Sequence, residues 1–175
     1  MEEIQNKVTN SSLVVFDLED YFPAEMHQTI AISQWLFEGF ILKEKDFREH
    51  LKNHNWSQYL NTNVAISIPE DTIIPAWATI LVASHVAQFA KNVVVGNYND
   101  LLISLYQETL SKLDYSIYFN KAVILKGCSK KPVPESAYIY ALQHLQKVAK
   151  SIMYGEACSA VPLFKTTKAS IFKNK

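Results

Sequence analysis

The loop after residue 126 carries the side chains best suited to chemistry. An apolar run before it predicts a buried strand, and the loop itself reads Gly127, Cys128, Ser129, Lys130, Lys131. Cys128 is the strongest nucleophile here. The positive end of a helix starting near Pro134 and the two lysine ammonium groups would favour its thiolate. The loop therefore predicts a reactive thiol; the alternative is that Cys128 is an inert, apolar packing residue.

The same loop could hold an anion, because free backbone amides at a helix start and two lysines suit a phosphate-sized group. It lacks the spacing of a Walker loop and the three glycines of a dinucleotide fingerprint. In a parallel sheet, ligands bind beyond the carboxyl ends of the strands, where Glu70 and Asn97 also fall. The predicted ligand- or anion-binding residues are Ser129, Lys130, Lys131, Asn97 and Glu70.

Another constellation is Asp46, His50 and His54, which are spaced by four residues. One helical face could present this carboxylate and the two imidazoles to a metal ion. The glutamate of the metalloprotease motif is absent between the histidines, and helix surfaces carry such residues by chance. They are the candidate metal ligands, and the sequence predicts no cofactor.

The second cysteine, Cys158, follows a predicted helix over 135–153. A helix of nearly twenty residues separates its ends by ~28 Å. If the next strand is parallel, Cys158 starts it at the edge opposite Cys128. We therefore expect Cys158 to serve packing or a subunit contact, and a disulfide with Cys128 would need a second subunit.

Short apolar strands alternate with amphipathic helices along most of the chain. This alternation indicates right-handed βαβ units and a mainly parallel sheet with helices on both faces, hence an α/β fold. The predicted strands cover 12–18, 29–33, 64–68, 93–95, 122–125 and 160–164, and the predicted helices cover 43–53, 75–90, 98–113 and 135–153.

The length of 175 residues suits a single domain over 1–165. We divide it into an N-terminal strand and helix extension, 1–62, and a βαβ-type half, 63–165. The basic stretch 166–175 lacks a pattern and is predicted to be a disordered tail. We find no internal sequence repeat.

Composition limits the function classes. Seventeen basic and seventeen acidic residues balance to zero formal charge, which argues against a general nucleic-acid binder or an anionic-membrane binder. The N-terminus does not resemble a signal peptide. The apolar window 73–90 is interrupted by polar residues and by Pro75, so we expect a buried helix rather than a membrane span. Two cysteines fit a reducing compartment, and we expect a cytoplasmic protein.

Five strings together resemble a bacterial family known as domain of unknown function 2480. They are FDLEDYFP, ILKEKDFREH, NWSQY, KGCSKKPVPESAY and SIMYGEACSAVPLFK. The family has no established activity and supplies no catalytic residue. The resemblance implies an association with the sulfur-mobilisation machinery of iron-sulfur cluster assembly, whose genes lie beside those of family members. In that setting an exposed thiol such as Cys128 could accept persulfide sulfur or ligate iron.

Three hypotheses follow. The first is a non-catalytic accessory protein of iron-sulfur cluster assembly or sulfur handling, which acts through protein partners and a thiol at Cys128. The second is a small enzyme or anion-binding protein that uses the crevice at the strand ends. The third is a structural homodimer with inert cysteines, in which apolar helices such as 73–90 form the interface.

Overall fold

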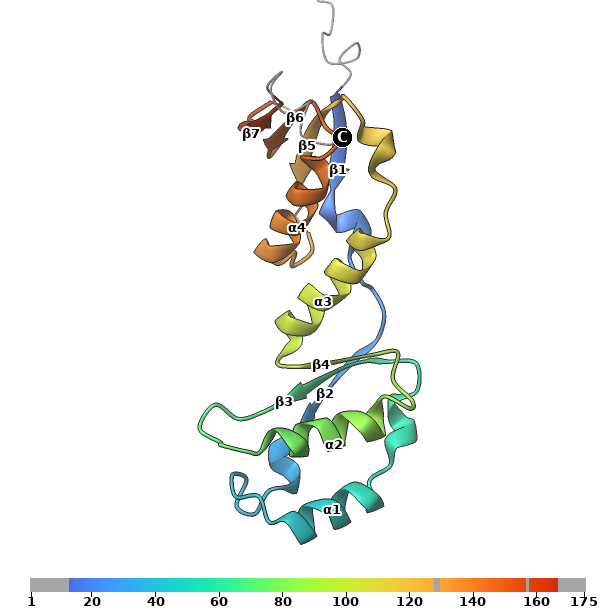
Figure 1. Cartoon of the computed structure of the whole chain (residues 1–175), viewed down its shortest axis with the longest axis vertical. Coiled ribbons are helices and arrows are strands. Elements are labelled where there is room, and N and C mark those ends of the chain that lie inside the picture. Colours follow the sequence, from blue (N-terminus) through green and yellow to red (C-terminus); the bar gives the residue numbers. More distant parts are fainter. Residues whose placement is uncertain (1–12, 128–129, 157, 167–175) are drawn as a thin grey trace, which may run out of the picture. The chain divides into compact units, whose positions relative to one another are not determined.

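The computed structural model describes residues 13–127, 130–156 and 158–166. The chain forms two compact units (Figure 1). We call 23–105 the inserted unit, and 13–22 with 106–166 the discontinuous unit, because its sequence is interrupted by the inserted unit. The α/β class is confirmed, with two mainly parallel sheets in place of the one predicted. Whether the two units act as one domain stays a prediction.

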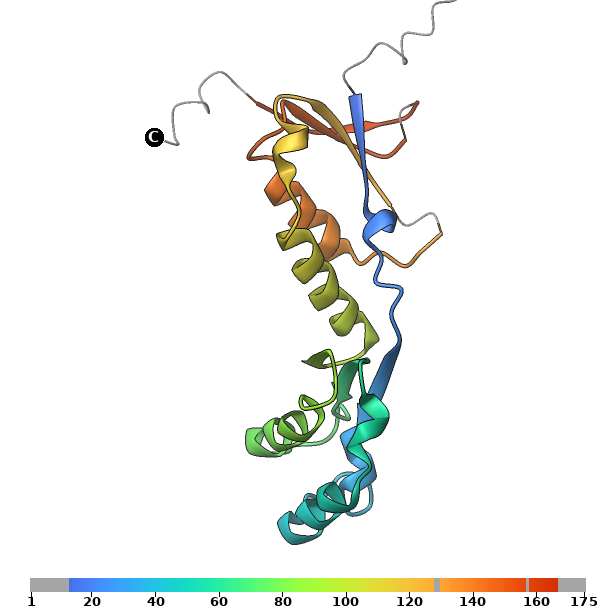
Figure 2. The same ribbon diagram turned by 90° about the vertical axis from the view of Figure 1, so that its right-hand side faces the viewer.

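The inserted unit contains a parallel sheet in the order β2-β3-β4. One core cluster joins Phe47 of α1 and Val82 of α2 to Val64 and Ile66 of β3, so both helices cover the same face (Figures 1 and 2). Its elements are β2 (His27–Ala31), the 3-10 turn η2 (Ile32–Trp35), α1 (Glu44–Asn53), the 3-10 turn η3 (Trp56–Tyr59), β3 (Asn63–Ser67), α2 (Ala76–Val86) and β4 (Asn92–Val95). The helix α3 (Tyr98–Ser111) begins in this unit and ends in the other.

The discontinuous unit contains a sheet in the order β1-β5-β6-β7. The first three strands are parallel, and β7 is antiparallel to β6. The sequence prediction placed the first strand in an extension, whereas it pairs with β5, the strand that follows the inserted unit. The elements are β1 (Leu13–Asp17), the 3-10 turns η1 (Leu18–Tyr21) and η4 (Tyr115–Tyr118), β5 (Ala122–Lys126), α4 (Glu135–Leu145), β6 (Ser151–Tyr154) and β7 (Val161–Lys165).

The two units repeat the same order of elements, and the prediction of no internal repeat is wrong. Both read strand, 3-10 turn, helix, 3-10 turn, strand, helix, strand. The segment 55–97 aligns without a gap with the segment 59 positions later in the sequence. Identical residues at this spacing include the pairs Ser57/Ser116, Tyr59/Tyr118, Asn61/Asn120, Pro75/Pro134, His85/His144 and Gly96/Gly155.

Equivalent side chains make equivalent contacts in the two units. The Trp56 indole donates to the Leu51 carbonyl over 2.9 Å, and the Tyr115 hydroxyl donates to the Leu110 carbonyl over 3.0 Å. Trp56 also stacks on His85, as Tyr115 does on His144.

The backbone repeats as well, because Asn61 and Asn120 adopt positive φ angles of 58° and 55°. A glycine follows the last strand of each repeat, Gly96 after β4 and Gly155 after β6. We infer that one copy of a βαβαβ unit is inserted into another.

Within the described residues, no helix is long and apolar enough to cross a membrane.

Candidate functional site

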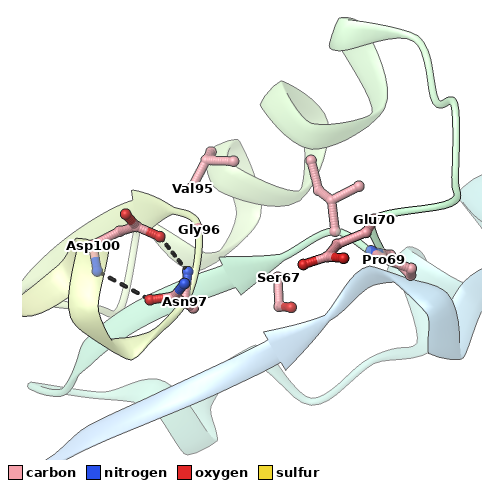
Figure 3. Close-up of a pocket in the computed structure, with 8 residues that line it drawn as sticks. Ser67, Pro69, Glu70, Val95, Gly96, Asn97 and Asp100 are labelled. Atoms are coloured by element: carbon pink, nitrogen blue, oxygen red, sulfur yellow. Dashed lines mark hydrogen bonds between the residues drawn. The ribbon is translucent and has the colours of Figure 1, made fainter.

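A hollow of about 400 Å³ lies at the carboxyl ends of β3 and β4 in the inserted unit (Figure 3). This is the edge at which parallel α/β sheets bind ligands. It brings together Glu70 and Asn97, two of the predicted binding residues. The lining residues are Ser67, Ile68, Pro69, Glu70, Val95, Gly96, Asn97 and Asp100.

One wall of the hollow is the capped start of α3. The Asn97 side chain accepts hydrogen bonds from the Asn99 and Asp100 amides over 2.7 and 3.2 Å. The Asp100 carboxylate in turn accepts the Asn97 amide over 2.7 Å (Figure 3). These reciprocal bonds form a capping box, in which side chains satisfy amides that have no partner inside the helix. Three amides of the first turn are therefore already occupied.

The charge of the lining favours a cationic or neutral polar ligand. Glu70 and Asp100 supply two carboxylates, and among the residues that the structure describes no lysine, arginine or histidine lines the hollow. The Glu70 carboxylate extends over Ser67 toward the centre of the site (Figure 3). An anion would meet these two carboxylates and three amides that already have acceptors. The geometry therefore favours a positively charged group over the predicted anion at this edge.

At the matching edge of the discontinuous unit, a lysine side chain supplies a positive charge. Lys126 stands where the inserted unit has Ser67, and its ammonium lies 3.2 Å from Asp17 and 3.6 Å from Glu156. The hydrogen bond and charge of Asp17, followed by the charge of Glu156, raise the pKa of Lys126. This edge thus places an ammonium group between two carboxylates, whereas Ser67 leaves the other hollow without one.

The predicted cysteine and lysine loop lies in the discontinuous unit, and Cys128 and Ser129 fall outside the described residues. The Lys130 amide donates to the Glu19 carboxylate over 2.8 Å, and the Lys131 ammonium donates to the Glu19 carbonyl over 2.9 Å. Glu19 is only 9% exposed. The described part of this loop thus binds the carboxylate and the backbone carbonyl of Glu19 in the same chain. Lys130 and Lys131 belong to a different unit from Glu70 and Asn97.

The candidate metal ligands are not brought together. Asp46 and His50 are exposed on α1, while His54 follows the helix and is half-buried. The His54 ring contacts the Tyr59 hydroxyl over 3.1 Å, and burial lowers the pKa of His54. Across the described ranges, no group of three or more His, Cys, Asp or Glu residues could hold a metal ion.

Cys158 lies where the sequence analysis did not place it. The predicted helix over 135–153 is wrong beyond Leu145, because Ser151–Tyr154 forms β6. Since β6 runs parallel to β5, Cys158 comes after the carboxyl edge at which β5 also ends. The last residue of β5 lies two residues before Cys128 in the sequence. Cys158 is a free, exposed thiol. The argument that one long helix holds the cysteines at opposite edges therefore fails.

Sequence reasoning missed Asp100, Glu19 and Lys126. Asp100 was detectable, because Asn97 followed three residues later by an acidic residue is a capping-box pattern. The other two depend on pairings between distant segments, since Glu19 and Lys130 are 111 positions apart. No local pattern announces such a contact.

The model of a family described as "Protein of unknown function (DUF2480)" matches residues 2–166. No curated protein and no solved structure matches the chain.

Proposed function

We propose that this chain, which belongs to the DUF2480 family, is a non-catalytic accessory protein of iron-sulfur cluster assembly or sulfur handling. The observation that carries the proposal is the exposed thiol of Cys158 beyond the carboxyl end of β6. The neighbouring strand β5 leads to Cys128 within two residues. Two cysteines that follow adjacent parallel strands suit a protein that accepts or passes on sulfur.

The chemistry of this role is persulfide transfer. The Cys158 thiolate attacks the outer sulfur of a donor persulfide, a new sulfur-sulfur bond forms at Cys158, and the donor leaves as a thiolate. The sulfur atom moves without any other oxidant or reductant. Exposure is the requirement that Cys158 meets, because the transfer needs access for the donor. Through its cysteines the protein would then exchange sulfur with partners of the assembly machinery.

The test combines sulfur transfer with capture of partners. We expect the reduced protein to gain one sulfur atom at Cys158 from glutathione persulfide, as measured by peptide mass spectrometry. Cys158→Ser should lose that modification while circular dichroism shows an intact fold. Cys128→Ser should keep it, which distinguishes the two thiols. Tagged protein should also recover cluster-assembly components from cells. Absence of both sulfur uptake and such partners would end the proposal.

A second candidate is binding of an ammonium-bearing ligand in the hollow of the inserted unit. It is favoured by the comparison with Lys126, whose ammonium lies between two carboxylates at the matching edge. The hollow has two carboxylates of its own, Glu70 and Asp100, and Ser67 at the lysine position. A primary ammonium group from a small amine or a partner's lysine would supply the missing charge.

We expect propylammonium chloride to shift the backbone amide resonances of Gly96, Asn97 and Asp100 in two-dimensional NMR spectra. Ser67→Lys places a side-chain ammonium in the hollow, so it should abolish these shifts and raise the melting temperature. Tetramethylammonium chloride at equal ionic strength is the control, because it has charge but no N–H donor. Equal shifts in the wild type and Ser67→Lys, or shifts scattered over the surface, would contradict the assignment.

A further inference from the structure

The outer edge of β4 has no neighbouring strand in the part of the chain that the structure describes. β4 ends the sheet order β2-β3-β4. The Gly96 amide donates to the Ile66 carbonyl of β3 over 2.9 Å. Backbone groups of successive residues in a strand point to opposite sides, so those of Val93 and Val95 point away from β3. The edge therefore offers two amides and two carbonyls to a further strand.

The repeat shows which kind of strand fits this edge. The equivalents of those two valines in β6, Ile152 and Tyr154, pair with Phe164 and Val161 of the antiparallel strand β7. With β7 in place, Ile152 is fully buried, whereas Val93 is only half-buried. An antiparallel strand beside β4 would complete the sheet of the inserted unit in the same way.

The chain does not supply this strand from its described residues. After β6 it returns as β7, whereas after β4 it continues into α3. Tyr98 at the start of α3 stacks on His27 of β2, with ring centroids 4.3 Å apart. Since β2 is the opposite edge of the sheet, the chain crosses the sheet at this point instead of returning beside β4. Val95 is accordingly 52% exposed.

The composition of β4 does not protect its edge against pairing. Edge strands commonly carry a charged side chain or a proline that blocks a further strand. The edge strand β7 contains Pro162 and ends at Lys165, whereas β4 (Asn92–Val95) has neither feature. Lys91, which precedes β4, is ion-paired with Glu25 of the same chain. β4 therefore has the composition of a strand that is paired on both sides.

The hollow lies where an added antiparallel strand would begin. Such a strand starts beside the carboxyl end of β4, just as Val161 at the start of β7 lies opposite Tyr154 at the end of β6. The hollow occupies this end of β4 and contains the carboxylates of Glu70 and Asp100, and none of its described lining residues is cationic. A free N-terminus would bring an α-ammonium group to these carboxylates. The charge thus favours a chain end over an internal segment.

We propose that the edge of β4 binds the N-terminal residues of a partner protein as an antiparallel strand, with the α-ammonium group in the hollow. Main-chain hydrogen bonds to Val93 and Val95 hold the strand, and the hollow selects the free amino group. The selection of the amino group rests on the second candidate function, the binding of an ammonium group in the hollow. The strand pairing rests on β4 alone, and neither part depends on the sulfur-transfer role.

The first test uses a synthetic peptide with the sequence of residues 160–166, because this segment contains the strand that covers the equivalent edge. With a free amino terminus, the peptide should shift the backbone amide resonances of Val93, Val95 and Asn97 in NMR spectra of the full chain. N-acetylation removes the charge and should weaken binding about tenfold. Equal affinity of the two peptides would refute the role of the α-ammonium group, and unchanged β4 resonances would refute the strand pairing.

The second test changes the edge itself. Val95→Pro removes an outward amide without taking a bond from β3, so it should abolish peptide binding while circular dichroism shows an intact fold. The matched control is Thr29→Pro on β2, which should bind as the wild type. Thr29 also points away from β3, because the neighbouring pair is joined by the Asn63 amide and the Met26 carbonyl. Binding that survives Val95→Pro would overturn the proposal.

Further outcomes distinguish this proposal from the ammonium site on which it partly rests. Glu70→Gln should weaken binding of the free peptide but not of the acetylated one. Shifts with propylammonium chloride but with neither peptide would leave the ammonium site standing and overturn the strand pairing. A dimer in sedimentation velocity that the peptide dissociates would identify β4 of a second copy as the occupant, and so refute a partner's N-terminus.

Discussion

Phe47→Ala is expected to lower the free energy of unfolding of the inserted unit by about 3–5 kcal/mol. The Phe47 ring is fully buried, with Trp35 and Trp77 ring centroids at 6.3 and 6.1 Å. Removing it leaves a cavity between α1, α2 and the sheet. All three tryptophans lie in this unit, so tryptophan fluorescence during urea unfolding reports it selectively.

The matched control is Phe40→Ala. That side chain is 53% exposed, and its removal should change stability by no more than about 0.5 kcal/mol. Tyr106 is the equivalent of Phe47 and is also fully buried; its hydroxyl donates to the Leu18 carbonyl over 3.0 Å. Tyr106→Ala should cost a similar amount, detected by far-ultraviolet circular dichroism. A loss below about 1 kcal/mol for Phe47→Ala would show that this ring does not hold the core.

The elements with a clear local pattern were predictable. The helix expected over 43–53 is α1 at Glu44–Asn53, because Phe47 and Leu51 mark one inward face. The strand expected over 122–125 is β5, with a buried centre. The helix expected over 135–153 went wrong because Ile152 continues the inward spacing of Leu145 and Ala149, although Ser151–Tyr154 pairs with β5.

The repeat would have corrected that error. Lys91 and Gly96 flank β4, and the identical Lys150 and Gly155 flank the misassigned segment. A glycine at position 155 also suits the end of a helix, whereas Gly155 follows a strand as Gly96 does. The signal was hard to see because the identities are scattered and most core positions exchange one apolar residue for another. The division into two sheets was still harder to predict, because β1 pairs with β5, and the whole inserted unit lies between them in the sequence.

Two of the eight residues that line the hollow were predicted from the sequence. Glu70 and Asn97 were found because the ends of parallel strands share one edge, which is a rule of topology. The expected anion site at the loop stays a prediction. No local window could show that the Lys130 amide and the Lys131 ammonium bind Glu19. The charge of the hollow likewise depends on Asp100, whose carboxylate is oriented by the Asn97 amide.

Gly96→Ala should be the most damaging substitution at the site. The residue has φ +137°, and a Cβ there would lie 2.2 Å from the Asp100 carboxylate. Alanine would therefore strain the backbone, at about 1–3 kcal/mol. It would also displace Asp100 from the Asn97 amide and break the cap of α3, at about 1 kcal/mol. We expect a combined loss of about 2–4 kcal/mol in urea unfolding followed by tryptophan fluorescence.

Gly155→Ala is the matched control, because Gly155 ends the equivalent strand. Its φ is +110°, but the nearest atom to an added Cβ is 3.6 Å away. This variant should show backbone strain alone. Its loss is followed by far-ultraviolet circular dichroism, because all three tryptophans lie in the inserted unit, and the difference between the two losses measures the cap. Adding Asp100→Ala to Gly96→Ala removes the collision, and the double variant should lose less than the sum of the single losses. Strictly additive losses would mean that Asp100 does not couple Gly96 to the start of α3.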